Sequence, residues 1–325
     1  MRIPRKHIPL VASVAVYLVL YAAASWRYGD QNFFTFQVFL NFLRGYATLG
    51  IISVGMTFVI LSGGIDLSVG AVMSLTSVVI GVLIMDAGLP PAIAVPAAIL
   101  VGGAIGLAQG LVIHAVDIKP FIVTLAGMFF ARGLGFIIHL ESIEIAHPQY
   151  GEIVGLGIPL GGGYRLGITS VLFLAVVAAG IYAARYTAFG RNVYALGGSE
   201  EAARLMGLPV GRTKVAVYAL SGLCAGLAGA VLTFDQSSGN HGAGVGMELE
   251  AIASVVVGGT LLTGGVGSIL GTFVGVLTIG LIREVITSFE GTQSSGVASV
   301  AIGVLLLAFV LMQRLIGRRA GPAGA

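Results

Sequence analysis

A polar interval in a largely apolar chain, residues 187–214, has the residue types and spacing of a binding element. Ser199 is a favourable N-cap, and Glu200 and Glu201 follow in the first turn, where the helix dipole favours acids. Gly207 fits the position that ends a helix, and the proline two residues later prevents continuation. The spacing predicts a helix of about two turns, too short to be stable alone in water. It is either a docking element for a soluble partner or an ordinary solvated loop.

A second polar position lies in a glycine-rich break between two apolar runs. Asp66 and Ser68 follow the pair Gly63 and Gly64 in this break. As structural residues, Asp66 or Ser68 could cap the helix that follows. As functional residues, they could mark a hinge or gate near a transport path. We favour the cap, and the two roles are compatible.

The common motifs of catalysis and nucleotide binding are missing from the sequence. It has no Gly-x-x-x-x-Gly-Lys-[Ser/Thr] phosphate loop, no His-Glu-x-x-His, and a single cysteine, Cys224. His114 and His139 lie at the ends of apolar runs, and we expect them to be helix-end residues rather than metal ligands. The net charge of +3 is too small to indicate nucleic acid. We therefore expect no cofactor, no metal and no enzymatic activity in this chain.

The elements that position these residues must lie in a membrane. Apolar residues make up 57% of the 325 residues and charged residues only 10%, against roughly 25% charge in average soluble domains. A crossing helix needs about 20 apolar residues, and about ten segments approach that length. They are 8–26, 42–62, 68–86, 91–116, 120–139, 167–187, 213–233, 249–263, 266–287 and 295–313. The breaks around Gly63 and Gly264 are short and glycine-rich, and 249–263 with 266–287 could form one broken or re-entrant unit, so about eight to ten spans fit the sequence.

Basic residues predict the orientation of the chain. With a cytoplasmic N-terminus and about ten spans, most of the 17 Lys and Arg residues fall on the cytoplasmic side, as the positive-inside rule requires. They are Arg2, Arg5, Lys6, Lys119, Arg185, Arg191, Arg204, Arg212, Lys214, Arg314, Arg318 and Arg319. Both termini and loop 188–212 are then cytoplasmic, and loop 140–166 faces outside. We predict an all-α polytopic membrane protein with one transmembrane domain over residues 1–325.

Arg132 is the one charged residue well inside an expected span. Such a residue either has a functional role or pairs with span-end carbonyls or a nearby acid, and the sequence leaves both readings open. No acidic residue falls clearly in mid-span, which argues against a proton-driven carrier.

Glycine spacing predicts how the helices pack. Many of the 50 glycines are four residues apart, as in Gly102, Gly106 and Gly110 or in Gly222 and Gly226. In lipid this spacing lets helix backbones approach closely.

One glycine pattern occurs twice. Residues 61–70 and 262–271 both read Leu-[Ser/Thr]-Gly-Gly-[Ile/Val], with another glycine five residues later. Transporters are often built from repeats whose broken helices line the path. Gly264 and Gly265 therefore join the first glycine pair as expected gate or break residues, although so short a match can also arise by chance.

Four stretches together resemble the permease subunits of bacterial ABC importers for monosaccharides, the ribose/xylose/galactose group. They are residues 49–70, 119–128, 190–208 and 248–268. They follow the family order over nearly the whole chain, which looks most like one of the two permeases of a galactofuranose-type importer. Glu250, often aspartate in the family, and Met206, often polar, depart from the pattern and could bear on partner choice.

The resemblance implies an inner-membrane permease that works by alternating access. Its implied partners are an ABC ATPase, a periplasmic sugar-binding protein, a second permease subunit and membrane lipid. The Glu-Ala-Ala…Gly pattern of importer coupling loops carries over to Glu201, Ala202, Ala203 and Gly207. The expected ATPase-coupling residues are Ser199, Glu200, Glu201, Ala202, Ala203, Arg204 and Gly207. The alternatives are a secondary sugar carrier driven by an ion gradient and a membrane scaffold that does not transport.

Overall fold

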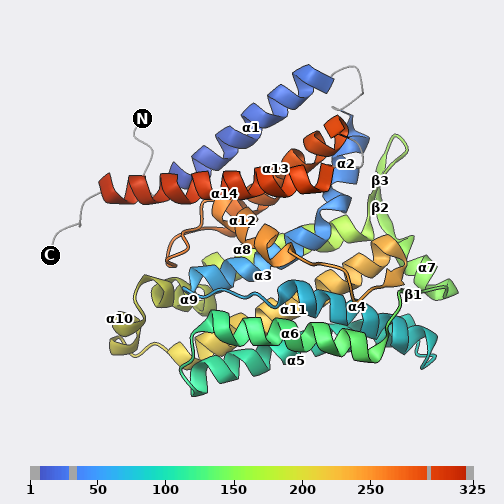
Figure 1. Ribbon diagram of the computed structural model, residues 1–325, viewed down its shortest axis with the longest axis horizontal. Helices are drawn as coiled ribbons and strands as arrows, with labels where there is room; N and C mark the ends of the chain where they lie inside the picture. The colour runs from blue at the N-terminus through green and yellow to red at the C-terminus, as the bar shows by residue number, and fades with distance from the viewer. Residues whose placement is uncertain (1–7, 29–34, 291–293, 320–325) are drawn as a thin grey trace.

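The computed structural model describes residues 8–28, 35–290 and 294–319, and helices account for most of them (Figure 1). The long helices are α1 (Ile8–Tyr28), α3 (Ala47–Leu61), α4 (Val69–Met85), α5 (Pro91–Ala115), α6 (Pro120–Ile138), α8 (Ile168–Tyr186), α11 (Val210–Gln236), α13 (Ile269–Glu290) and α14 (Ser294–Arg319). The shorter ones are α2 (Phe36–Gly45), α7 (Pro148–Val154), α9 (Ala188–Gly198), α10 (Glu200–Leu205) and α12 (Met247–Val257).

Two small sheets add to a mainly helical fold, which agrees with the predicted all-α class. Strands β1 (Ile143–Glu144) and β4 (Ser238–Gly239) pair antiparallel, as do β2 (Gly157–Gly161) and β3 (Tyr164–Gly167). The β2–β3 hairpin turns through three glycines with positive φ, a conformation that glycine adopts readily. The glycine-rich polar loop 140–166 thus contains strands that its hydropathy does not predict.

Five described helices are long and apolar enough to cross a membrane, or six if the bent pair α2 and α3 forms one span. The axes of α2 and α3 differ by 56°. The expected span 249–263 is wrong as a crossing helix, because α12 has 11 residues. At about 1.5 Å per residue it reaches roughly half of the ~30 Å hydrocarbon core. The total of about ten spans stays a prediction.

The centre of the molecule is α3, in which nearly every side chain is buried. It lies among α8, α11, α12 and α13, and their buried apolar residues belong to one large cluster. In contrast, α5 and α6 expose apolar side chains such as Leu100, Phe129 and Ile137. Exposed apolar surface of this kind is what a helix needs against lipid.

Glycines bring α5 and α11 into direct backbone contact, as their spacing predicts. A Cβ atom added at Gly106 would lie 2.2 Å from the Tyr218 carbonyl oxygen, and one at Gly222 would lie 2.3 Å from the Gly102 carbonyl oxygen. Gly226 packs in the same way against the backbone of Ile99. These contacts confirm the predicted close packing, which is how helices gain dispersion energy in lipid.

The two polar loops lie at opposite ends of the helix bundle. Figure 1 shows α10 at the left end, and α7 with the β2–β3 hairpin at the right end. The start of α1 and the end of α14 lie toward the α10 end. This arrangement fits the predicted topology, although the chain ends themselves, 1–7 and 320–325, lie outside the described residues.

Candidate functional site

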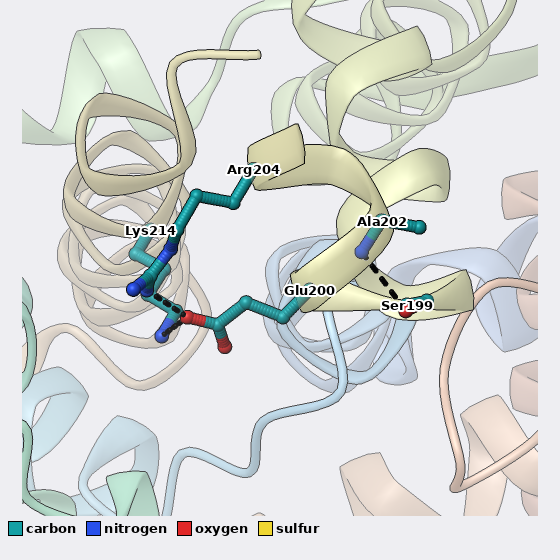
Figure 2. A network of polar contacts seen from close by, with 5 residues as sticks. All are labelled: Ser199, Glu200, Ala202, Arg204 and Lys214. Atoms are coloured by element: carbon teal, nitrogen blue, oxygen red, sulfur yellow. Dashed lines mark hydrogen bonds and ion pairs between the residues drawn. The ribbon is translucent and has the colours of Figure 1, made fainter. Parts of the chain in front are cut away.

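The short helix α10 has the predicted start and stop. Ser199 Oγ accepts a hydrogen bond from the Ala202 amide at 3.2 Å (Figure 2), so it is the N-cap. Gly207 has φ +75° and donates its amide to the Arg204 carbonyl at 3.0 Å, while the next amide bonds to Ala203. This left-handed cap satisfies the last carbonyls of the helix. Residues local in sequence thus determine both ends of α10.

Glu200 attaches α10 to the start of α11. Its Oε1 accepts hydrogen bonds from Lys214 Nζ at 2.8 Å and Arg204 Nη2 at 3.0 Å (Figure 2). Partial burial acts to raise the pKa of Glu200, but the hydrogen bonds and charges of Lys214 and Arg204 outweigh it and leave the pKa below its ordinary value. Glu200 is therefore an anion in a structural contact rather than a free docking charge.

The two faces of α10 differ in burial. Ala203 is buried with Leu196 of α9 and Val210 of α11. On the outward side, Leu205 is 82% and Met206 66% exposed, and Glu201 is exposed as well. An apolar tip with an acid beside it is a surface suited to a protein groove rather than to water.

Helix α9 lies in the same loop and was not predicted from the sequence. Thr187 is its N-cap, since Thr187 Oγ1 accepts from the Gly190 amide at 3.2 Å. The ring of Phe189 lies 5.5 Å from that of Phe58 in α3, and the Tyr194 hydroxyl donates to the Gly267 carbonyl at 2.9 Å. The threonine cap and the terminal glycine pair were the signals that could have revealed α9.

The two glycine-rich breaks lie against each other at the end of α9. Gly63 and Gly264, which occupy matching positions of the echoed pattern, have φ values of +84° and +86°. The Gly265 amide donates to the Leu61 carbonyl at 2.9 Å, and thereby joins the break after α3 to the break before α13. The chain thus brings the expected gate residues into contact with the loop that carries the expected coupling residues.

Asp66 is 1% exposed and is held by hydroxyl and amide donors. Its Oδ1 accepts from the Ser68 amide at 2.9 Å and the Ser68 hydroxyl at 2.6 Å, and its Oδ2 accepts from Ser221 of α11 at 2.7 Å. The next residue, Leu67, donates its amide to Thr124 Oγ1 of α6 at 3.1 Å. Helices α6 and α11 therefore hold the break in place.

Two expectations for this break are wrong. Ser68 precedes α4, but its side chain makes no cap hydrogen bond, because its hydroxyl donates to Asp66 instead. Asp66 accepts from Ser68 itself rather than from the first turn of α4. The helix break carries this carboxylate into the protein interior, while the absence of an acid in mid-span stays a prediction.

The surroundings of Asp66 hold two further buried polar groups. Within the described residues, Gln109 Nε2 of α5 and the Tyr218 hydroxyl of α11 have no hydrogen-bond partner. The Ser68 hydroxyl also lies 3.2 Å from Gln109 Oε1. Polar groups from three helices thus converge on this break.

Arg132 of α6 lies apart from these residues. Its Nη1 donates to the carbonyls of His241 at 2.7 Å and Ala243 at 2.6 Å, in the loop between β4 and α12. A functional role and pairing with backbone carbonyls were the two interpretations of Arg132, and this geometry agrees with the pairing.

Comparison with known proteins supplies the context for this geometry. Residues 38–312 match the family described as the permease component of branched-chain amino acid transport systems. The inner membrane ABC transporter permease protein YjfF of Escherichia coli K12 is 46% identical over 310 residues, which cover 95% of this chain and 93% of that protein. The ribose import permease RbsC of Bacillus subtilis is 41% identical, covering 85% and 84%. The fructose import permease FruG of Bifidobacterium longum is 35% identical, covering 97% and 93%.

Proposed function

The chain belongs to the family of permease components of branched-chain amino acid transport systems, and on this premise we propose that it is the membrane subunit of an ATP-driven monosaccharide importer. It is an inner-membrane transport subunit rather than an enzyme. ATP is hydrolysed on a separate ATPase subunit, and a periplasmic binding protein delivers the sugar. A second permease subunit completes the path.

The observation that carries this proposal is the form of α10. Its N-cap, its left-handed C-terminal cap and the Glu200–Lys214 ion pair hold a helix that is too short to persist alone. The same helix leaves Leu205 and Met206 exposed. A rigid helix with an unpartnered apolar tip fits a groove in a soluble protein, and the ATPase is the partner that this family needs.

The cargo is a monosaccharide, and galactofuranose is the one that we propose to test first. Relatives with more than a third of their residues in common are named as import permeases for fructose and ribose. The galactofuranose assignment rests on the resemblance of the sequence stretches described above. In this class of importer the external binding protein mainly selects the sugar. The permease then needs only weak polar contacts with the sugar along its path.

The two breaks are the proposed moving parts. ATP-driven closure of the partner draws two coupling helices together, and the spans tilt to reverse the opening. Gly63, Gly264 and Gly265 give the breaks conformations that other residues resist. Gly64 is needed for space, because a Cβ atom there would lie 2.2 Å from the Tyr218 hydroxyl oxygen. Asp66 keeps the first break in its shape, and Arg132 keeps the β4–α12 loop in place; neither binds the sugar in this proposal.

Glu201→Arg tests the docking face. The complex of this chain with its ATPase, second permease and binding protein is reconstituted in vesicles, and uptake of labelled D-galactose is measured beside D-ribose, D-fructose and L-arabinose. We expect uptake to be abolished while insertion and expression persist, because a cation in the exposed first turn opposes the helix dipole. Glu152→Arg, an exposed acid of α7 at the opposite end, is the matched control.

Unchanged uptake by Glu201→Arg would show that α10 is not the coupling element. The secondary carrier makes a different prediction, namely uptake by this chain alone when an ion gradient is imposed without the ATPase. Family membership favours the importer over that class.

A further inference from the structure

Gly197 occupies the point where α9 meets both breaks. A Cβ atom added there would lie 1.8 Å from the Leu61 carbonyl oxygen and 2.5 Å from the Gly265 amide nitrogen. Those two atoms are themselves joined by a hydrogen bond of 2.9 Å. Because the crowding atoms are backbone, a side chain at Gly197 could be accommodated only by moving the breaks apart.

The rest of α9 is fixed to the same two segments. Phe189 packs on Phe58 near the end of α3, and Tyr194 donates its hydroxyl proton to the Gly267 carbonyl. α9 thus contacts the segment before the first break by one ring and the second break by one hydrogen bond. Neither contact involves α10 directly.

α10 is in turn attached to α9. The residue after the glycine pair is Ser199, the N-cap of α10, and its amide donates to Ala195 of α9 at 3.1 Å. Leu196 and Ala203 are buried in one small cluster across the two helices. A displacement of α10 must therefore move the C-terminal end of α9, where Gly197 lies.

We propose that Gly197 is the positioning residue through which movement of α10 reaches both breaks at once. This inference rests on the proposed importer function and adds to it the contact that transmits the motion. The close approach at Gly197 lets the backbone of α9 push on the Leu61–Gly265 hydrogen bond directly. A flexible side chain at this place would absorb the displacement.

The adjacent glycine provides a matched control. A Cβ atom added at Gly198 would meet nothing within 4 Å, and its φ lies outside the left-handed region. Gly197→Ala and Gly198→Ala therefore make the same chemical change one residue apart. In the reconstituted complex, ATP hydrolysis and uptake of labelled D-galactose, D-ribose, D-fructose and L-arabinose are measured on the same vesicles.

We expect Gly197→Ala to lower the sugar taken up per ATP hydrolysed by about tenfold, within the range of measured coupling effects. ATP hydrolysis and the yield of assembled complex should stay near wild type, a separation that a purely structural role would not produce. Gly198→Ala should match wild type in all three measurements.

Tyr194→Phe keeps the inference testable if Gly197→Ala does not assemble. It removes only the hydrogen bond to Gly267, and we expect a smaller fall in sugar per ATP with normal assembly. If Gly197→Ala does not assemble, wild-type uptake of sugar per ATP by Tyr194→Phe would overturn the role of Gly197. If it does assemble, equal uptake per ATP by the Gly197→Ala and Gly198→Ala variants would overturn it. Wild-type uptake that does not require ATP would instead refute the importer assignment itself.

Discussion

The two breaks share a sequence pattern but hold their shapes by different means. Both contain a left-handed glycine at the matching position of the pattern, Gly63 in the first and Gly264 in the second. The first break then has a buried carboxylate, Asp66, held by hydroxyl groups. The second break, residues 258–268, has no charged residue.

The second break depends on backbone contacts instead. Four of its glycines, at positions 259, 264, 265 and 267, have positive φ. Gly264 and Gly265 lie directly against the backbone at the end of α9. Donors around a buried carboxylate therefore shape the first break, whereas close backbone contact, with one hydrogen bond from the Tyr194 hydroxyl, shapes the second. A single type of mutation should affect the two unequally.

The largest effect is expected from Asp66→Leu. It leaves the Ser68 amide and the Ser221 hydroxyl buried without an acceptor, at ~1–3 kcal/mol for each group, and leaves the Ser68 hydroxyl only Gln109 Oε1 at 3.2 Å. We expect a large fall in the thermal unfolding temperature of the detergent-purified chain. Asp66→Asn, which keeps an acceptor oxygen, should recover most of the stability. Equal losses for the two variants would mean that the negative charge, not hydrogen-bond acceptance, holds the break.

The matched pair Gly264→Ala and Gly63→Ala sharpens the comparison. Each should lose about 1–2 kcal/mol because left-handed backbone disfavours a Cβ atom. At Gly264 the new atom would also lie 2.9 Å from the Gly63 amide nitrogen and 3.0 Å from Gly197 backbone atoms, whereas at Gly63 the nearest atom is 3.9 Å away. Thermal unfolding should therefore show a larger loss for Gly264→Ala. Identical losses would contradict the claim that the second break depends on close backbone contact.

The smallest effect is expected from Ser221→Ala. It removes one donor to Asp66 and should cost about 1 kcal/mol, typical of one hydrogen bond. Ser62→Ala is the control, because the Ser62 hydroxyl bonds only to the nearby Val59 carbonyl. A Ser221 variant as stable as the Ser62 variant would show that α11 does not help to hold the first break.

The features that could be predicted well depend on residues near one another in the chain. The caps of α10 involve Ser199 and Gly207, a few residues from the groups they satisfy, so both were predictable. Close packing of α5 on α11 follows from a spacing rule and was predictable for the same reason.

What could not be predicted depends on contacts distant in sequence. The position of Asp66 looked like a cap because its partner Ser221 belongs to α11. The length of α12 was overestimated because apolar residues continue beyond Val257 into a glycine-rich break that hydropathy does not distinguish from a helix. The crowding at Gly197 could not be predicted, since it comes from two segments that only the fold brings together.

The hydrogen bond from Gly265 to Leu61 has a consequence for biosynthesis. The ribosome delivers the first break to the membrane long before the second one exists. Until the later half inserts, the Leu61 carbonyl lacks this donor, and apolar surroundings make an unsatisfied carbonyl costly. The nascent chain should therefore complete its centre only near the end of translation, and truncation anywhere before Gly265 should leave a product that quality-control proteases recognise.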